Sequence, residues 1–312
     1  MVWDRTGGTV RAVPPVKRLE VAIGETTLSL SNLDKILYPA VGFTKGQVID
    51  YYTRMAPVLL GHLRDRPLTL KRYPNGVDAA HFYEKRRPSH APDWVQSAPV
   101  WSGRNEGDID YVLCQDLPTL VWLANLADLE LHTPLARVPD MERPTLIAFD
   151  LDPGPPATVV ECARVALELR RAFAFWELEA FAKTSGSKGM QVYLPLNTPV
   201  TYEQTRAFSR GLAQLLERRD PEHVVSDMSK AKRTGKVFVD WSQNDRHKTT
   251  VNVYSLRAME RPTVSTPLTW DEVSDVADGG TAVFTSDEVL ARVEALGDLW
   301  EPVQTLEQEL PG

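Results

Sequence analysis

Cysteine is almost missing from this sequence of 312 residues. The two cysteines, Cys114 and Cys162, stand in apolar segments and form no CxxC pair, which argues against a disulfide scaffold and favours reduced core thiols. No run approaches the roughly 20 apolar residues that cross a bilayer, and the first residues carry no apolar secretion signal. With 43% hydrophobic and 25% charged residues, the composition is that of a folded globular protein. We therefore expect a cytoplasmic protein with no membrane partner.

Basic residues are scarce mainly at the C-terminal end of the chain. The formal net charge is −7, but residues 270–312 contain eleven acidic residues and one basic residue. The preceding 269 residues therefore carry a net charge of +3 and can present basic faces to a polyanion. We expect the last forty residues to form one or two acidic helices, which cover the domain or screen it against non-specific binding of DNA.

The spacing of apolar residues predicts a mixed order of helices and strands. After Thr44, which suits an N-cap, Val48, Ile49 and Tyr52 recur at helical spacing. Few strands alternate cleanly with helices, which indicates an α+β protein rather than a doubly wound sheet. The expected elements are a hairpin around 24–25, strands at 67–74, 111–114, 145–152, 181–185, 189–196, 236–241 and 248–254, a polar loop at 102–110, and helices from Thr44 and at 116–132, 157–175 and 202–219.

Two carboxylates lie close together on the predicted strand 145–152. Side chains alternate along a strand, so Asp150 and Asp152 share one face about 6–7 Å apart. Such a pair is relieved by a cation, and hard oxygen ligands suit Mg²⁺ or Mn²⁺, although a simple strand end before a Pro-Gly turn explains the pattern at least as well. Asp240 in the strand 236–241 adds a third carboxylate if the strands meet. Three carboxylates without histidine or cysteine favour two such ions over zinc.

Three further segments carry groups that suit phosphates or bases. The turn 183–189, KTSGSKG, offers backbone amides, hydroxyls and a lysine to a phosphate, but a flexible hairpin loop explains it equally well. Residues 228–248 carry a charge of +4 beside Asp240, which suits a nucleotide or a nucleic acid. Residues 64–87 hold seven basic side chains among Tyr73, Phe82 and Tyr83. Cations beside exposed rings bind unpaired bases, whereas Tyr73 is better explained as a core residue.

These motifs in this order resemble the polymerase domain of bacterial ligase D, a branch of the archaeo-eukaryotic primase superfamily used in end-joining repair. The resemblance extends from about Asn32 to Trp270. It implies a primase-polymerase fold of the α+β class, in which a mixed or antiparallel sheet core carries the carboxylates, with flanking helices and an N-terminal α/β subdomain. We expect a loose extension at 1–17, one catalytic unit of two lobes at 18–270, and an acidic helical tail at 271–312. The segments that carry the resemblance are SNLDKILYP, TLKRYPNGVD, FYEK, WLANLADLELH, DLDPG, TSGSKG, VFVDWSQN and YSLRA.

The resemblance also implies roles for individual residues. Asp150, Asp152 and Asp240 correspond to the ligands of two catalytic Mn²⁺ or Mg²⁺ ions, which serve in-line transfer of a nucleotide to a primer 3′-hydroxyl. Phe82 and Tyr83 correspond to a ring pair that stacks on the template, and 102–110 to a loop proposed to bring two DNA ends together. The positions that contact the incoming nucleotide are His132, Ser185, Lys188, Gln191, Arg233, Gln243 and Arg257. A downstream 5′-phosphate is bound by Asn32, Lys35 and Lys45, and further DNA contacts come from Lys71, Lys230 and Lys232.

Gln191 departs from the family pattern, which has a histidine at this position. A glutamine amide donates a hydrogen bond but carries no positive charge. We therefore expect triphosphate binding to be weaker by about 1–3 kcal/mol, because a charge-assisted hydrogen bond is lost.

The sequence thus predicts a template-dependent nucleotidyltransferase that fills short gaps at DNA breaks, in end joining or excision repair, and prefers ribonucleotides. No second catalytic domain fits after Trp270, so we expect a stand-alone, nucleoid-associated polymerase that acts with a separate ATP-dependent DNA ligase and, by analogy, bacterial Ku. Two alternatives stay open. One is a module that binds 5′-phosphorylated DNA ends through Lys35 and Lys45 and polymerises poorly. The other is a metal-dependent phosphatase or nuclease that uses the same carboxylates.

Overall fold

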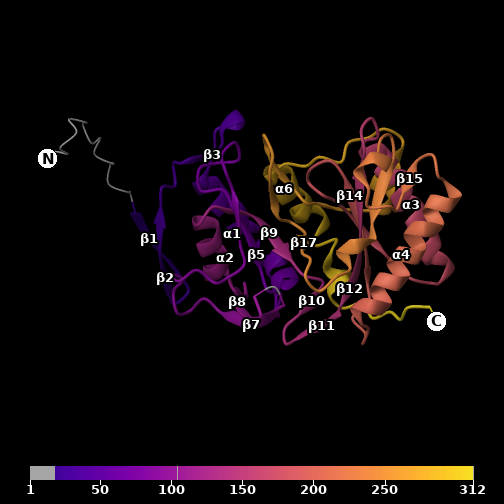
Figure 1. Cartoon of the computed structure of the whole chain (residues 1–312). Helices are drawn as coiled ribbons and strands as arrows, with labels where there is room; N and C mark the ends of the chain where they lie inside the picture. Colours follow the sequence, from indigo (N-terminus) through magenta and orange to yellow (C-terminus); the bar gives the residue numbers. More distant parts are fainter. Residues whose placement is uncertain (1–17, 104, 312) are drawn as a thin grey trace, which may run out of the picture.

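The computed structural model describes residues 18–103 and 105–311, and the expected N-terminal extension at 1–17 lies outside them. Two lobes stand side by side, one built on a four-stranded sheet and the other on a six-stranded sheet (Figure 1). The expected α+β class is confirmed. None of the helices in the described residues is long and apolar enough to cross a membrane.

The first lobe combines a small antiparallel sheet with two helices and three hairpins. The sheet runs in the order β17-β9-β5-β6, with β17 (Thr250–Val251), β9 (Asp128–Thr133), β5 (Thr69–Arg72) and β6 (Phe82–Glu84). The helices are α1 (Lys45–Leu63) and α2 (Leu117–Asn125). The hairpins are β1 (Arg18–Ile23) with β2 (Thr26–Ser31), β3 (Ile36–Tyr38) with β4 (Phe43–Thr44), and β7 (Ser97–Ser102) with β8 (Gly107–Val112).

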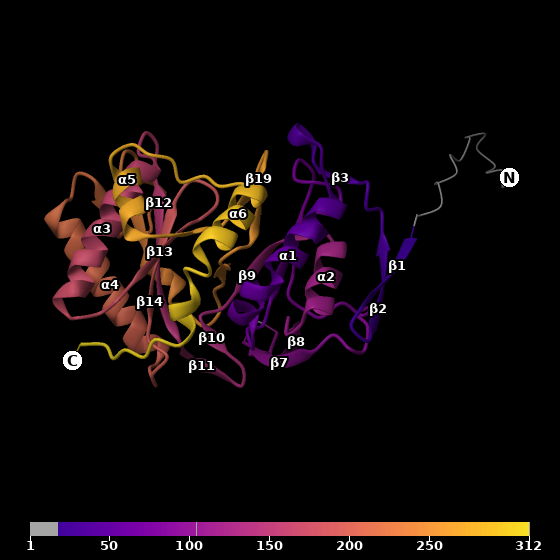
Figure 2. The ribbon, with the colours of Figure 1, turned by 180° about the vertical axis from the view of Figure 1, so that it is seen from behind.

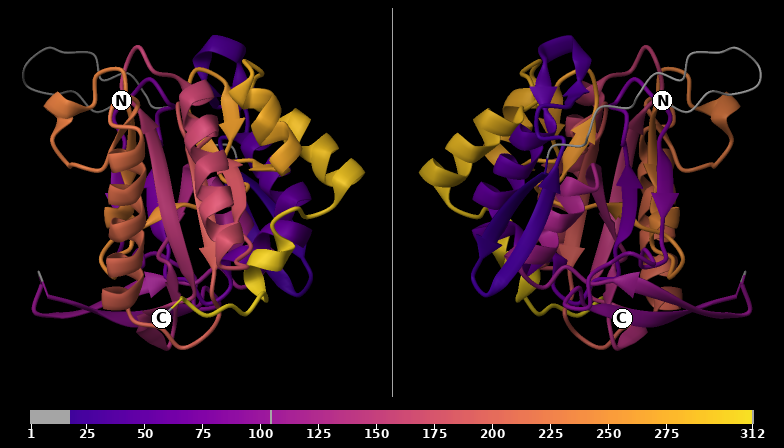
Figure 3. Two further views of the ribbon diagram at one scale, coloured as in Figure 1. Left: turned by 90° about the vertical axis from the view of Figure 1, so that its right-hand side faces the viewer. Right: turned by 90° about the vertical axis from the view of Figure 1, so that its left-hand side faces the viewer.

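The second lobe has a larger sheet in the order β15-β16-β12-β14-β13-β20, in which only β15 and β16 run parallel. Helices α3 (Val159–Phe175) and α4 (Tyr202–Arg219) cover its outer face (Figure 3). The strands are β12 (Leu146–Pro153), β13 (Phe181–Thr184), β14 (Met190–Pro195), β15 (Val224–Val225), β16 (Val237–Asp240) and β20 (Pro267–Leu268). Two short hairpins are β10 (Ala136–Arg137) with β11 (Asp140–Pro144) and β18 (Leu256–Ala258) with β19 (Pro262–Val264).

The six-stranded sheet separates two hydrophobic cores. Along β12, Ile147 and Phe149 pack into the core under α3 and α4, whereas Leu146 and Ala148 belong to the core of the first lobe. This alternation follows from the two-residue period of a strand. Asp150 has the same parity as Ala148, so the sheet turns its carboxylate away from the covering helices and toward the first lobe.

The acidic C-terminal segment packs against both lobes. It contains α5 (Trp270–Ala277) and α6 (Ser286–Leu296), which lie on the side of the molecule seen in Figure 2. Val273 on α5 joins the core of the second lobe, whereas Val289 on α6 and Trp300 join that of the first. The expectation of one or two acidic helices is confirmed.

Two expectations for the first lobe are wrong. The segment 116–132 is not one helix, because α2 ends at Asn125 and Ala127 adopts a left-handed φ of 57° before β9 begins. A continuous apolar run does not distinguish a buried strand from a buried helix by its periodicity. The segment 102–110 is not a loop, because Gly107 to Asp110 pair with β7 as part of a hairpin. By contrast, Thr44 caps α1 in a capping box, as expected.

Candidate active site

One row of side chains crosses four neighbouring strands of the six-stranded sheet. The register pairs Lys183 on β13 with Gln191 on β14, Gln191 with Asp150 on β12, and Asp150 with Asp240 on β16. Residues in direct register point to the same face of a sheet, with Cβ atoms about 4.5–5.5 Å apart. Asp150 and Asp240 are therefore neighbours, although a long stretch of chain separates them.

The carboxylates of this row repel one another. Asp240 is 9% exposed, while Asp152, two positions beyond Asp150, opens toward solvent at the end of β12. Burial and the Asp152 carboxylate raise the pKa of Asp150 to about 7. Partial burial of its carboxyl group and the nearby Asp240 raise the pKa of Asp152 as well. A cation between the three acids would relieve this repulsion.

The chemistry of these donors suits Mg²⁺ or Mn²⁺, both of which prefer carboxylate oxygens. Asp240 Oδ1 accepts a hydrogen bond from the backbone of Ser242 at 2.9 Å, and Oδ2 accepts one from Gln243 Nε2 at 3.0 Å. Within residues 18–103 and 105–311, no three His, Cys, Asp or Glu side chains are gathered closely enough to hold an ion as they stand. Ser242 and Gln243 thus hold the Asp240 carboxylate from its own turn.

Gln191 is buried in the row, and both ends of its amide are engaged. Its Nε2 donates to Asp150 Oδ1 at 3.0 Å, while its Oε1 accepts from Lys183 Nζ. The amide has only one orientation that satisfies both partners, because an ammonium only donates and an ionised carboxylate only accepts. Within the protein the Gln191 amide is thus engaged by two side chains of the sheet, and its expected contact with a triphosphate stays a prediction.

Lys183 begins the segment 183–189 that was expected to suit a phosphate, and the structure places it in the sheet row. It is 1% exposed, and its amine donates to Gln191 Oε1, to Ser265 Oγ and, at 3.1 Å, to the carbonyl of Val251. Val251 belongs to β17, so Lys183 joins the six-stranded sheet to the sheet of the first lobe. Burial lowers the pKa of Lys183 to about 7 against the opposing effect of Asp150. A lone lysine between Ala182 and Thr184 in a buried strand was the signal that could have identified it.

The turn between β13 and β14 is fixed by close packing of its glycines. Gly186 has a φ of +67°, and a Cβ there would lie 2.7 Å from the side chain of Arg257. A Cβ on Gly189 would lie 2.2 Å from the carbonyl oxygen of Leu151. Ser185 Oγ accepts hydrogen bonds from two backbone N–H groups of the turn. The turn is therefore ordered by these contacts, and Lys188 stands exposed on it.

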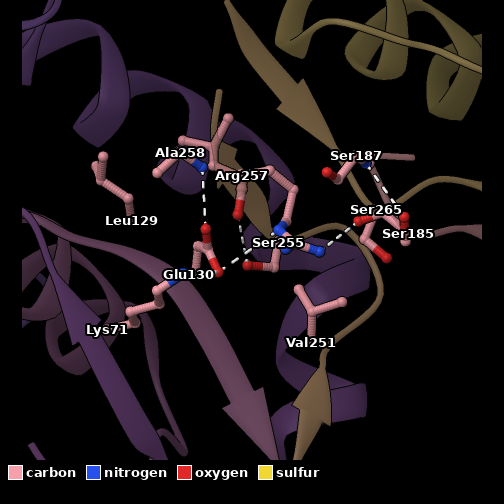
Figure 4. Close-up of polar contacts among 12 residues, drawn as sticks. Lys71, Leu129, Glu130, Ser185, Ser187, Val251, Ser255, Arg257, Ala258 and Ser265 are labelled. Atoms are coloured by element: carbon pink, nitrogen blue, oxygen red, sulfur yellow. Dashed lines mark hydrogen bonds and ion pairs between the residues drawn. The ribbon is translucent and has the colours of Figure 1, made fainter. Parts of the chain in front are cut away.

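Arg257 connects this turn to a buried carboxylate of the first lobe (Figure 4). Its Nη1 donates to the carbonyl of Ser185, and its Nε lies 3.5 Å from Glu130 Oε2. Glu130, 2% exposed, also contacts Lys71 at 3.1 Å and His132 at 3.0 Å. Burial opposes ionisation, but the hydrogen bond to His132 and the Arg257 charge hold the pKa of Glu130 below its usual range. Sequence reasoning missed Glu130 because the segment that carries it was expected to be helical.

The ring pair Phe82 and Tyr83 lies on the surface strand β6. The two side chains are 43% and 58% exposed. The Arg72 guanidinium lies 5.1 Å from the centre of the Phe82 ring, and Lys71 Nζ lies 5.6 Å from that of Tyr83. Exposed rings beside cations form a surface suited to unpaired bases. Tyr73, at 3% exposed, is a core residue as expected.

Basic residues before β16 line the rim beyond the carboxylates. The Arg233 guanidinium lies 3.6 Å from the centre of the Phe238 ring. Lys230 is exposed, whereas Lys232 forms an ion pair with Asp227 at 2.6 Å. Lys232, like Lys71, is thus paired with a carboxylate of the chain, and its expected contact with DNA stays a prediction.

Asn32, Lys35 and Lys45 form a basic pocket beside the start of α1. The backbone joins them, since Lys35 N–H donates to the Asn32 carbonyl at 3.0 Å and Lys45 N–H to the Lys35 carbonyl at 2.8 Å. Burial and the Lys35 charge lower the pKa of Lys45 to about 8. Neither lysine forms an ion pair with a carboxylate of the described chain. Lys45, 5% exposed, donates to the Ser31 carbonyl at 2.6 Å, and Lys35 donates to Asn75 Oδ1 at 2.9 Å.

The structure thus brings the expected residues together in separate groups. Asp150, Asp240, Gln191 and Gln243 form the sheet row, which adjoins the Glu130 group through Lys183 and the Ser185 turn. The Glu130 group is made of Lys71, His132, Ser185 and Arg257. Among the described residues, no hydrogen bond or ion pair joins the pocket of Asn32, Lys35 and Lys45 to the sheet row.

Comparison with known proteins assigns this fold to a family. The family model described as LigD, primase-polymerase domain, matches residues 44–300. The chain belongs to this family. The polymerase domain of Mycobacterium tuberculosis ligase D, solved in complex with DNA, is 41% identical and superposes with a TM-score of 0.84, covering 90% of this chain and 99% of that one. The expected ligase D resemblance is therefore confirmed.

Curated members of the LigD family are longer proteins. The multifunctional non-homologous end joining protein LigD of Mycolicibacterium smegmatis is 42% identical over 276 residues, which cover 88% of this chain but 36% of that protein. The bifunctional LigD of Bacillus subtilis is 34% identical over 271 residues, which cover 86% of this chain and 43% of that protein. The chain thus spans well under half of the relatives' length.

Proposed function

We propose that this member of the LigD primase-polymerase family is a template-dependent nucleotidyltransferase that fills short gaps at DNA breaks in end joining or excision repair. The observation that carries the proposal is the direct pairing of Asp150 with Asp240, on the sheet face that turns toward Arg257 and the first lobe. The relatives are named as end-joining proteins, and the related structure contains DNA; both support the substrate class.

Asp150, Asp152 and Asp240 would hold two divalent cations, Mn²⁺ or Mg²⁺. Such ions, when bound, supply charge neutralisation for the attacking and leaving oxygens of phosphoryl transfer. The chain itself orients Asp150 through Gln191, and it orients Asp240 through Ser242 and Gln243. The raised pKa of Asp150 and that of Asp152 fit a site that is completed by cations.

The Ser185 turn and its partners would bind the incoming nucleotide. The Ser187 and Gly189 N–H groups are already drawn together by Ser185, so the turn needs little ordering when a phosphate arrives. Arg257 is held beside it by Glu130, which supplies a preoriented cation. The remaining nucleotide contacts would come from His132, Lys188, Arg233 and Gln243. Phe82 and Tyr83 would stack on template bases, and a preference for ribonucleotides is part of the proposal.

The pocket of Asn32, Lys35 and Lys45 would bind the 5′-phosphate downstream of the gap. A terminal phosphate dianion has the charge that two lysines without a carboxylate partner can neutralise. Lys71 and Lys230 would add contacts to the DNA backbone. A separate DNA ligase and bacterial Ku are the proposed protein partners, by analogy with the end-joining relatives.

A second candidate is a 5′-phosphate end-binding module with weak polymerase activity. Two observations favour it: Gln191 stands at the family's histidine position, and the carboxylates are not gathered around one point as they stand. The two candidates share the 5′-phosphate pocket and differ only in whether nucleotides are added.

The test is extension of a labelled primer on a gapped, 5′-phosphorylated duplex with Mn²⁺ and NTPs or dNTPs. Wild type should extend the primer, and Asp150→Ala should lower the rate at least about a hundredfold, since removal of a metal ligand affects several kcal/mol of transition-state stabilisation. Asp50→Asn, an exposed carboxylate on α1, is the matched control. If wild type does not extend the primer, the polymerase proposal fails.

The binding arm uses the same duplex with either a 5′-phosphate or a 5′-hydroxyl. Lys35→Ala and Lys45→Ala should remove the preference for the phosphate, while Arg54→Ala on the exposed side of α1 should keep it. Loss of this preference without any extension activity would favour the end-binding module. Release of nucleotides from DNA without added triphosphate would instead indicate a nuclease.

A further inference from the structure

A continuous chain of hydrogen bonds leads from a buried amine to the carboxylate row. Lys183 Nζ donates to Gln191 Oε1, and Gln191 Nε2 donates to Asp150 Oδ1 at 3.0 Å. The three residues are in direct register across β13, β14 and β12. Lys183 has its remaining hydrogens on Ser265 Oγ and the Val251 carbonyl, so its three donors are satisfied and its position is fixed.

We propose that Lys183 is a positioning residue of the metal site: its ammonium fixes the Gln191 amide so that the amide N–H holds the Asp150 carboxylate in its ligating orientation. The inference rests on the proposed function, in which Asp150 binds a divalent cation. An amide without a fixed partner on Oε1 can rotate by about 180° and present its oxygen to Asp150. The amide oxygen then repels the Asp150 carboxylate. Lys183 excludes that orientation because an ammonium has no acceptor to offer the amide nitrogen.

The positioning effect is opposite in sign to the direct effect of the Lys183 charge. Through space, a positive charge near the row repels a divalent cation, so its removal should tighten metal binding. If Lys183 acts by orienting Asp150 through Gln191, its removal should weaken metal binding instead. Loss of a partner that orients a metal ligand typically weakens binding by about 10- to 100-fold.

The experiment measures the Kd for Mn²⁺ in the absence of DNA and nucleotide, from the electron paramagnetic resonance signal of free Mn²⁺. Lys183→Met keeps the length of the side chain and removes the amine, and it should raise the Kd about tenfold or more. Gln191→Leu should raise it by a similar factor. The double variant should be no weaker than Gln191→Leu alone, because Lys183 acts only through the amide. With primer and template, the rate of Lys183→Met should recover at saturating Mn²⁺.

Arg66→Met is the matched control for loss of a buried cation. Arg66 is 5% exposed and donates to the carbonyls of Pro134 and Ala136 but to no side chain of the row, so its loss should lower thermal stability and leave the Kd for Mn²⁺ unchanged. An unchanged or lower Kd in Lys183→Met overturns the inference. If Lys183→Met does not fold, an unchanged or lower Kd in Gln191→Leu overturns it equally. Failure of wild type to bind Mn²⁺ would instead contradict the proposed metal site itself.

Discussion

Glu130→Gln is the substitution that tests most directly how the two lobes are held together at the site. The two carboxylate oxygens have different partners. Oε1 accepts from the Tyr73 hydroxyl at 3.3 Å and from the Ala258 N–H at 3.1 Å. Oε2 faces Lys71 at 3.1 Å and Arg257 at 3.5 Å. Glutamine can keep the first set through its own oxygen, but its NH₂ group then points at two cations.

The expected cost follows from the burial of these groups. Glu130 is 2% exposed, and the side chains of Lys71 and Arg257 are 13% and 18% exposed. Removal of one partner from a buried ion pair costs about 3–5 kcal/mol, because the remaining charge is left without compensation. Glutamine preserves the Oε1 contacts, so we expect about 3 kcal/mol less free energy of unfolding at pH 7.

The pH dependence adds a second, independent signature. The pKa of Glu130 in the folded protein lies below its usual value. The ionised carboxylate therefore contributes fully to the free energy of unfolding above the unfolded pKa of about 4.3, and this contribution is lost as the pH falls toward the folded pKa. The difference in free energy of unfolding between wild type and Glu130→Gln should therefore decrease by about 1.4 kcal/mol for each pH unit below about 4.3.

The assay is urea denaturation of both proteins at pH 7, 4 and 3, followed by tryptophan fluorescence. Glu168→Gln is the matched control, because Glu168 pairs with Arg171 on the surface and is 49% exposed. This control should differ from wild type by no more than about 0.5 kcal/mol. The reasoning would be refuted if Glu130→Gln were as stable as wild type at pH 7. It would also be refuted if the difference in free energy of unfolding were the same at pH 3 as at pH 7.

Two further substitutions test the frame around the carboxylates. In Gly154→Ala, the new Cβ would lie 1.8 Å from the carbonyl oxygen of Arg233, so we expect about 1–3 kcal/mol of destabilisation and weaker nucleotide binding. Thermal unfolding and a nucleotide titration measure these two effects. An unchanged melting temperature would contradict the close packing of Gly154. Asn244 is fully buried and bonds both the N–H and the carbonyl of Ala148, which ties the turn after Asp240 to β12. Asn244→Ala should cost at least about 2 kcal/mol by urea denaturation, and a cost below about 0.5 kcal/mol would show that these bonds do not hold the turn.

Much of the fold could be predicted because its signals are local. The helix at 202–219 has the expected bounds, and the hairpin at 24–25 and the cap at Thr44 form as expected. The segment 116–132 could not be predicted, since Ala127 ends the helical region with a backbone conformation that its residue type does not signal. The loop at 102–110 was expected from its polarity, but an exposed hairpin strand is polar as well.

The residue types of the candidate site could be predicted from the sequence, but only some of the contacts between them could. Asp150 and Asp152 share a strand, so their common face follows from alternation alone. Gln191 was expected to face a ligand, whereas the structure gives it two partners within the sheet. Glu130 was missed because its segment was expected to be helical, and the contacts of Lys183 depend on strands that are distant in the sequence.

The sequence by itself determined most of the strands, the polar faces of those strands and the residue types that are present for metal and phosphate chemistry, because these properties depend on neighbours a few positions away. Only the tertiary structure decided that Asp240 lies beside Asp150, that Lys183 reaches Asp150 through Gln191, and that one buried carboxylate gathers three basic side chains. Strand order and register are set by the packing of two cores on opposite faces of one sheet. That packing sums over contacts between residues far apart in the chain, which no local pattern encodes.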